Sequence, residues 1–479
     1  MQKNDTFAAM VISSISTGAK DFTRGAIFKP LVRLAMPIMA TNFAQMAYNL
    51  TDMAWVGRLG SESVAAIGAV GMLTWLCSSF SMLTKIAAEV SIGQAIGARK
   101  GREAMEYASH TTTISLIMSL IIATILFSCA EFILSFFKFL PQIQELAVEY
   151  LQIVALSIPF SFIILNFVGV YNGVGRSNIP FLIVCSGLIC NMLVDPLFIF
   201  GIPGVFEGMG VRGAALATVI VQGAVVLLFV YRLRRKDGIL NKFPFLVRLQ
   251  GNFTMRVLRL GFPIAMMTLF FATINTYLTR IASVYGGHLG ITTQTTGGQI
   301  EGITWNTAQG FSSALGAFVA QNFAAGKMSR ARMAYRYTLR IMLSLGILVS
   351  VAFLLIGDKI FGVIIPETEA AIAGGDYLFA MGFCQIFMML ELTTQGMFNG
   401  MGRTLPPAIV SIVFNFARIP MALLFASWMG ITGVWWAIAV SSIIKGILLP
   451  LWLKKSTVKP LTIKNESGTN NREEQDGNC

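Results

Sequence analysis

Asn172-Gly-Val-Gly-Arg176 and Asn399-Gly-Met-Gly-Arg403 are two copies of one motif, N-G-x-G-R, and the second copy begins 227 positions after the first. Other residues recur at nearly the same step, namely Gln94 with Gln321, Lys100 with Lys327, Pro180 with Pro407 and Pro37 with Pro263. A nearly constant offset over most of each half indicates a chain made of two homologous halves. In an apolar chain, such a duplication is typical of a transporter built from two similar helical bundles.

The composition places this chain in a membrane. Of its 479 residues, 55% are hydrophobic and 12% are charged, whereas soluble domains carry about 25% charged residues. A membrane-spanning helix needs about 20 apolar residues. Twelve stretches meet this requirement, at 30–58, 62–92, 104–130, 147–172, 177–201, 210–233, 255–285, 292–321, 332–356, 373–400, 404–428 and 430–453.

We therefore expect an all-α integral membrane protein with twelve transmembrane helices in two pseudo-symmetric six-helix bundles. Six spans is an even number, so both halves enter the membrane in the same direction and their pseudo-two-fold axis runs along the membrane normal. The expected organisation is a cytoplasmic N-terminal segment (1–29), a first bundle (30–233), a cytoplasmic linker (234–254), a second bundle (255–453) and a disordered cytoplasmic tail (454–479).

The net charge of +13 is distributed unevenly. Lys and Arg collect in the N-terminal segment, the turn around Lys100, the linker, the run 327–340 and the tail, which all fall on one side of the predicted spans. The positive-inside rule then makes both termini cytoplasmic in a multi-pass protein of the inner or plasma membrane, in contact with lipids. A nucleic-acid partner is disfavoured because no aromatic-basic groove accompanies the charge.

Three predicted helices of the first half carry a polar residue at the same depth. Asp52 lies six residues before Arg58, Asp195 lies six residues before Gly201, and Thr218 lies six residues after Arg212. At 1.5 Å per residue, each lies roughly 9 Å inside the outer boundary. Ionisable groups at such depth are costly, so each needs a partner, a cavity or a function.

Helical spacing adds two residues to this set. Tyr48 precedes Asp52 by four residues and Asn191 precedes Asp195 by four, so each pair shares a helix face. Oxygen-rich groups suit Na⁺ or protons, and two carboxylates in an apolar site titrate as a pair. The pattern favours a cation-coupling site, with Na⁺ as one candidate ligand of Asp52, Asn191 and Asp195. The alternative is that both acids only bond to neighbouring backbone or hydroxyl groups.

The second half does not repeat these acids. At the repeat offset Asp52 falls on Leu278, and Asp195 falls on Ala422 or, with a three-residue gap, on Ile419. A duplicated scaffold that keeps an acidic set in one copy favours a function for that set. Elsewhere, Lys85 and Glu89 are four residues apart and fit a self-neutralising pair, and Pro37 is a candidate hinge of the first helix.

Glu301 and Glu391 are the acids predicted to lie within membrane helices of the second half. They are candidates for a substrate cavity that attracts a cation. Equally, either can pair with Arg280 or Arg418, two arginines that are also predicted to lie at membrane depth. The sequence leaves these two interpretations open.

Motifs for other chemistries are missing. There is no G-x-x-x-x-G-K-[ST] loop for ATP and no H-E-x-x-H for zinc, and the six cysteines show no C-x-x-C pairing. No nucleophile–base or metal constellation supports an enzyme. We therefore expect a transporter without a cofactor other than its coupling ion, acting as a monomer on a small-molecule drug or organic cation.

The order of the motifs resembles that of the multidrug and toxic compound extrusion (MATE) family over nearly the whole chain. The residues that carry the resemblance are Leu34-Ala-Met-Pro37, Tyr48-Asn-Leu-Thr-Asp-Met-Ala-Trp-Val-Gly-Arg-Leu-Gly60, Gln94-Ala-Ile-Gly-Ala98, Asn172-Gly-Val-Gly-Arg176, Asn191-Met-Leu-Val-Asp-Pro-Leu-Phe-Ile-Phe-Gly201, Gly210-Val-Arg-Gly-Ala-Ala-Leu-Ala-Thr218, Gln321-Asn322 and Gly430-Ile-Thr-Gly-Val-Trp-Trp-Ala437. The resemblance implies a V-shaped pair of six-helix bundles and drug export driven by a cation gradient.

In the DinF-like branch of that family, the first-lobe cation site uses residues that match Tyr48, Asp52, Asn191, Asp195 and Thr218, and Pro37 matches the proline where the first helix bends. Another branch relies on second-lobe acids, one of them in helix 7. Here helix 7 has no carboxylate, and Glu391 lies about a turn away from the matching position in helix 10. The alternative function is a lipid-linked oligosaccharide flippase of the same architecture, which requires Arg280 and Arg418 to face the lumen together.

Overall fold

The structure is a computed structural model that describes residues 19–202, 204, 206–236, 241 and 243–458. Residues 1–18 of the expected N-terminal segment, residues 237–240 and 242 of the linker and residues 459–479 of the tail lie outside the described residues.

In its described residues, the first half contains eight helices and a two-stranded hairpin. The helices are α2 (Phe28–Gly57), α3 (Ser61–Gly97), α4 (Gly101–Ser128), α5 (Ala130–Ser135), α6 (Pro141–Ala155), α7 (Ile158–Gly173), α8 (Asn178–Phe200) and α9 (Gly210–Lys236). Between α8 and α9, β1 (Gly201–Ile202) pairs with β2 (Phe206–Glu207) in antiparallel register, Gly201 with Glu207. The second half is entirely helical in its described residues, with α10 (Gly251–Ala324), α11 (Met328–Ile364), α12 (Thr368–Gly400), α13 (Leu405–Met429) and α14 (Ile431–Val458).

These helices form the twelve expected spans. The 74 residues of α10 are two spans that meet at Gly287, whose φ of 57° and ψ of −144° only glycine adopts readily. The two spans pack closely beside this junction, since a Cβ at Gly290 would lie 2.6 Å from the Ala282 carbonyl oxygen. Length and apolar composition alone identify nine spanning helices among the described residues, or ten with one bent pair.

The predicted fourth span is not one straight helix. It consists of α6 and α7, which are bent by 45° at a short break. Pro159 lies in the first turn of α7, where its missing N–H is tolerated but where it cannot continue a preceding helix. The sequence prediction of one apolar stretch at 147–172 missed this bend, because hydropathy does not report helix direction.

Both copies of the repeated motif end a helix in the same way. Gly175 and Gly402 have φ values of 81° and 74°. In each copy the arginine N–H closes the turn, from Arg176 to the Tyr171 carbonyl at 2.9 Å and from Arg403 to the Phe398 carbonyl at 3.0 Å. This is the Schellman arrangement that a glycine beyond the helix end permits.

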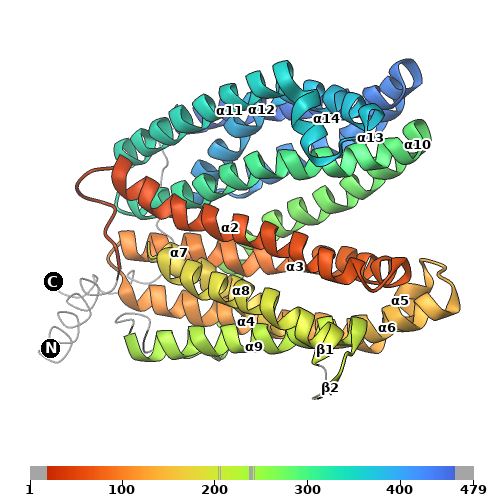
Figure 1. The fold of residues 1–479 in the computed structure, drawn as a ribbon. Helices are drawn as coiled ribbons and strands as arrows, with labels where there is room; N and C mark the ends of the chain where they lie inside the picture. Colours follow the sequence, from red (N-terminus) through yellow and green to blue (C-terminus); the bar gives the residue numbers. More distant parts are fainter. Residues whose placement is uncertain (1–18, 203, 205, 237–240, 242, 459–479) are drawn as a thin grey trace, which may run out of the picture.

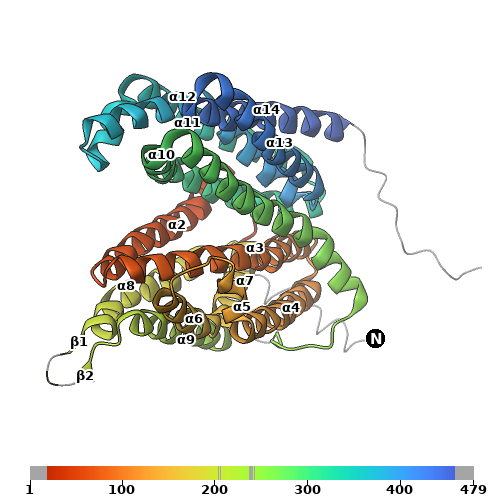
Figure 2. The same cartoon turned by 90° about the vertical axis from the view of Figure 1, so that its right-hand side faces the viewer.

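The two halves form two bundles that meet at one end and diverge toward the other (Figure 1). We call the end that holds residues 19–27 and the end of α14 the closed end, and the opposite end the open end; Figure 2 shows α3 facing α10 between the bundles. Near the closed end, a Cβ added at Gly93 would lie 3.0 Å from the Ala320 Cβ. Toward the open end, a Cβ added at Gly71 or Gly298 would have no described atom of another element within 4 Å. The bundles therefore approach each other closely near the closed end.

An apolar core that both bundles share holds the closed end together. Phe22, Leu31 and Leu34 from the start of the chain pack with Phe318 of α10 and Phe398 of α12. The rings of Phe22 and Phe318 are stacked with centroids 5.4 Å apart. Each bundle also has its own core, and another core joins α3, α7 and α9 to Val257 and Leu260 of α10. A change in the angle between the bundles must disturb both shared cores.

Candidate ion-coupling site

Tyr48 of α2 lies at the centre of the polar residues that the sequence predicts at one depth. The Asn191 amide Nδ2 donates to its hydroxyl at 2.8 Å. Thr218 of α9 also lies within hydrogen-bonding reach of this hydroxyl, and both carboxyls, Asp52 and Asp195, interact with it electrostatically. The structure thus brings all five predicted residues of the first half together.

The two carboxyl groups differ in exposure. Asp195 is fully buried, and neither of its carboxyl oxygens has a hydrogen-bond partner among the described residues. The Asn191 amide oxygen beside it is also buried and unpaired within the same described part. Asp52 is partly exposed and interacts electrostatically with Asp195. Within the described residues, Asp195 therefore does not bond to neighbouring backbone or hydroxyl groups, as the alternative interpretation required.

Sequence analysis missed Tyr150. This residue of α6 interacts electrostatically with both Asp52 and Asp195, and also with Tyr48. It lies nine residues after Pro141, the first residue of α6, which corresponds to roughly 13 Å along the helix. The depth rule did not indicate this residue, because the predicted fourth span begins at residue 147 and places Tyr150 only three residues from its start.

The donor atoms of this site are all oxygens of carboxyl, amide and hydroxyl groups. Such groups suit a hard monovalent cation or a proton. Buried, unpaired carboxyl oxygens are unfavourable unless a proton or a cation neutralises them, so the residues fit the predicted ligands. No group of three or more His, Cys, Asp or Glu side chains that could hold a metal ion occurs within the described ranges.

Glu391 of α12 lies inside the second bundle, with 6% of its surface exposed. The Lys445 ammonium of α14 lies 3.2 Å from its carboxylate, and the Ser411 hydroxyl donates to it at 3.0 Å. Its ion-pair partner is therefore a lysine, and Arg418, one of the two arginines that the sequence suggested, adds an electrostatic interaction. In this state its charge is balanced within the bundle.

Glu301 of α10 accepts a hydrogen bond from the Tyr377 hydroxyl at 3.2 Å and interacts electrostatically with Arg418. Arg418 is buried and donates to Ser441 at 2.7 Å and to Ser442 at 3.0 Å. The second bundle thus holds two acids and two bases that balance one another. Arg280, by contrast, is exposed on α10. Because Arg418 is buried inside the bundle, the two arginines do not form the cationic lumen that a flippase for pyrophosphate-linked lipids requires.

Glu89 of α3 forms a different contact from the predicted pair with Lys85. Both of its carboxylate oxygens accept from the Ser313 hydroxyl of α10 at 2.9 Å, across the two bundles. Asn172 of the repeated motif also donates to it at 3.4 Å, and Lys85 adds an electrostatic attraction. Glu89 therefore connects the bundles near the closed end.

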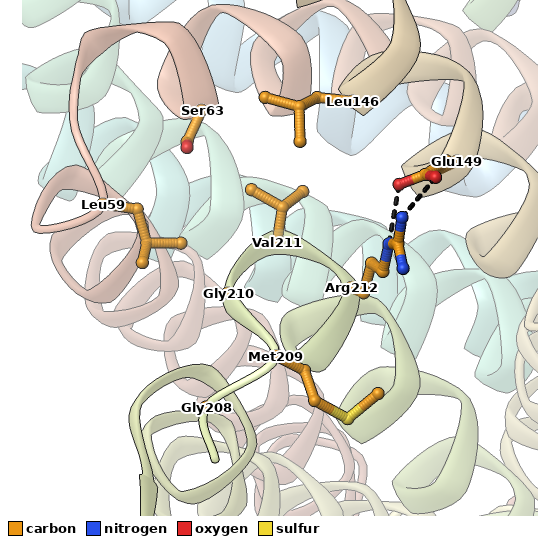
Figure 3. A pocket seen from close by; sticks show the side chains of 9 residues that line it. All are labelled: Leu59, Ser63, Leu146, Glu149, Gly208, Met209, Gly210, Val211 and Arg212. Carbon is orange, nitrogen blue, oxygen red and sulfur yellow. Dashed lines mark hydrogen bonds and ion pairs between the residues drawn. The ribbon is translucent and has the colours of Figure 1, made fainter.

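A pocket of about 500 Å³ lies at the open end of the first bundle, where the turn after α2 and the starts of α3 and α9 face α6 (Figure 3). Arg212 and Glu149 point toward each other on one side of it and form an ion pair, with Arg212 Nε 2.7 Å from a Glu149 carboxylate oxygen. The lining includes none of the five predicted site residues. We therefore treat this pocket and the acid pair as separate features.

Comparisons with known proteins agree with the duplicated plan. The family model MatE matches residues 37–197 and 263–424. A probable multidrug resistance protein NorM of Thermotoga maritima is 27% identical over 422 residues, which cover 85% of this chain and 88% of that protein. A probable multidrug resistance protein YpnP of Bacillus subtilis is 24% identical and covers 88% of this chain and 94% of its own. A solved structure described as the outward-facing conformation of a multidrug resistance MATE family transporter has a TM-score of 0.84 at 23% identity, over 92% of this chain and 98% of that chain.

Proposed function

The chain belongs to the MatE family of membrane transporters, and on that premise we propose that it is a secondary antiporter that exports drugs or organic cations in exchange for H⁺ or Na⁺. The coupling ion binds in the first bundle, at Tyr48, Asp52, Asn191, Asp195 and Thr218. The closed end is cytoplasmic and both termini lie there, in accordance with the basic residues of that side.

The observation that carries this proposal is the fully buried Asp195, whose two carboxyl oxygens have no partner among the described residues. An acid in this environment is stable only when a proton or a cation neutralises it. In the described part of the second bundle, both of the acids that the sequence placed at membrane depth have partners, because Glu391 is paired with Lys445 and Glu301 is bonded to Tyr377. Ion dependence therefore belongs to the first bundle.

Coupling follows from linkage between the two ligands. If the ion and the drug each weaken the binding of the other, an ion that arrives from the open end displaces drug to the outside. The ion-loaded protein then opens toward the cytoplasm, where it releases the ion and binds drug. Pro37 lies within α2, on the N-terminal side of Tyr48. We propose that Pro37 is the hinge at which this helix bends when the acids change their charge.

The test is transport of a fluorescent organic cation by purified protein in proteoliposomes, with a pH gradient and a Na⁺ gradient imposed separately. The wild type will export the dye under at least one gradient. Asp52→Asn will abolish gradient-driven export, because it keeps the size of the side chain but removes a charge of the pair. Both proteins should be folded, as judged by thermal stability in detergent.

Glu301→Gln is the matched control, since it makes the same change in the second bundle. It is expected to retain gradient-driven export. The proposal is wrong if Asp52→Asn exports at the wild-type rate, and the flippase function gains support if no dye moves under either gradient in the wild type.

A further inference from the structure

The repeated motif also supplies the acceptors of two reciprocal hydrogen bonds between the bundles. Gln94 of α3 and Gln321 of α10 are repeat partners, 227 residues apart. The Gln94 amide Nε2 donates to the Gly400 carbonyl of the second bundle at 3.0 Å. The Gln321 amide Nε2 donates to the Gly173 carbonyl of the first bundle at 3.5 Å. We infer that these bonds form a latch at the closed end that must open in each transport cycle.

The chemistry of helix ends explains why these carbonyls are available. Gly173 is the last residue of α7 and Gly400 is the last residue of α12. The last carbonyls of a helix have no partner within the helix and need one elsewhere. Each motif therefore ends its own helix and presents an acceptor to the other bundle. When the bundles separate, these carbonyls accept hydrogen bonds from water instead.

The second polar atom of each glutamine is also occupied. The Arg256 guanidinium at the start of α10 donates to the Gln94 amide oxygen at 2.5 Å. The Phe22 N–H, just before α2, donates to the Gln321 amide oxygen at 3.0 Å. The segment around Phe22 is itself bound to both bundles, through the Lys20 N–H to the Val174 carbonyl at 3.1 Å and the Asn322 amide to the Phe22 carbonyl at 3.2 Å. Both glutamines are buried, so their amides are held in one orientation.

Close packing keeps this interface dry. A Cβ at Gly97 would lie 2.1 Å from the Gln321 carbonyl oxygen, so only glycine fits there. Glu89 adds a further link to Ser313, and its carboxylate lies 3.6 Å from the position of a Cβ on Gly316, its own repeat partner. The Glu89 side chain of the first half thus lies next to the space that Gly316 of the second half leaves open, because glycine has no side chain. Hydrogen bonds in such a setting favour the closed arrangement more than exposed bonds do.

The inference rests on the proposed function in one respect, since a transporter has to open toward the cytoplasm at this end. Gln94 and Gln321 are positioning residues of that step, and they touch neither the ion nor the drug. Removing either amide will raise the ratio of cytoplasm-open to cytoplasm-closed protein. One such hydrogen bond corresponds to a change of about fivefold in that ratio, and both together to about 25-fold if they act independently.

The experiment measures distances between spin labels on the exposed positions Arg102 of α4 and Met333 of α11, in protein without native cysteines, drug or ion gradient. Gln94→Ala and Gln321→Ala are each expected to increase the long-distance population, and the double variant to increase it further. Gln222→Ala is the matched control, because Gln222 accepts from Ser161 within the first bundle at 2.6 Å, and it will leave the ratio unchanged. An unchanged ratio in the double variant overturns the inference.

A second measurement remains informative if the double variant does not fold. Gly93→Cys with Ala320→Cys joins two repeat partners whose Cβ positions are 3.0 Å apart, and a small relaxation brings them to the usual Cβ separation of a disulfide. Oxidation will stop transport and a reductant will restore it. Full transport by the oxidised protein contradicts the latch. Because these readouts use neither Asp52 nor an ion gradient, failure of the latch and failure of the antiport proposal are distinguishable.

Discussion

At the scale of single residues, the ion pair between Glu391 and Lys445 predicts a loss of stability when one partner is removed. Both are almost fully buried and lie 3.2 Å apart. We predict that Glu391→Gln lowers the free energy of unfolding by about 3–5 kcal/mol, because it leaves the lysine charge buried and unpaired. The measurement is thermal or denaturant unfolding in detergent. The double variant Glu391→Leu with Lys445→Met should recover most of the loss, and equal losses in both variants would contradict the pairing.

The residues of the ion site were predictable from the sequence because they follow helical geometry. Tyr48 with Asp52, and Asn191 with Asp195, are four residues apart, and this spacing places each pair on one helix face. Lys445 as the partner of Glu391 was not predictable, because contacts between helices depend on how the helices rotate and cross. The role of the five residues in ion coupling stays a prediction.

At the scale of helices, α3 has glycines in two different environments. A Cβ at Gly97 would meet the Gln321 backbone at 2.1 Å, whereas Gly71 meets no described atom within 4 Å. We predict that Gly97→Ala forces the bundles apart at the closed end and reduces transport at least tenfold. Gly71→Ala is the matched control and will be neutral or will stabilise the helix by up to about 1 kcal/mol. Equal transport by the two variants would show that the close approach does not matter.

Span positions were the most predictable feature of the helices, because a run of about 20 apolar residues is required by the membrane itself. The helix stops at Gly175 and Gly402 fall on the glycines of the repeated motif, where positive φ is readily adopted. Two features were not foreseen, namely the bend between α6 and α7 and the direct junction at Gly287. Both depend on backbone dihedral angles at a few residues, which hydropathy does not describe.

At the scale of the whole molecule, a symmetric scaffold carries an asymmetric set of charges. The helix ends and the latch glutamines repeat in both halves, with Gln94 and Gln321 donating to the opposite bundle. The buried acids do not repeat. In the second bundle Glu391 is paired with Lys445, while in the first bundle Asp195 has no partner among the described residues. We propose that the duplication supplies the scaffold that moves. Ion dependence comes from the first bundle, which contains Asp195.

The most direct test of this account is to titrate the purified, lipid-embedded protein with drug, without a gradient, and to measure the release of protons and of bound Na⁺. Linkage predicts that drug binding by the wild type releases one of these ions. Drug binding by Asp52→Asn combined with Asp195→Asn should release none, while Glu301→Gln should behave as the wild type. Ion release that persists in the double aspartate variant and disappears in Glu301→Gln would place coupling in the second bundle and contradict the account.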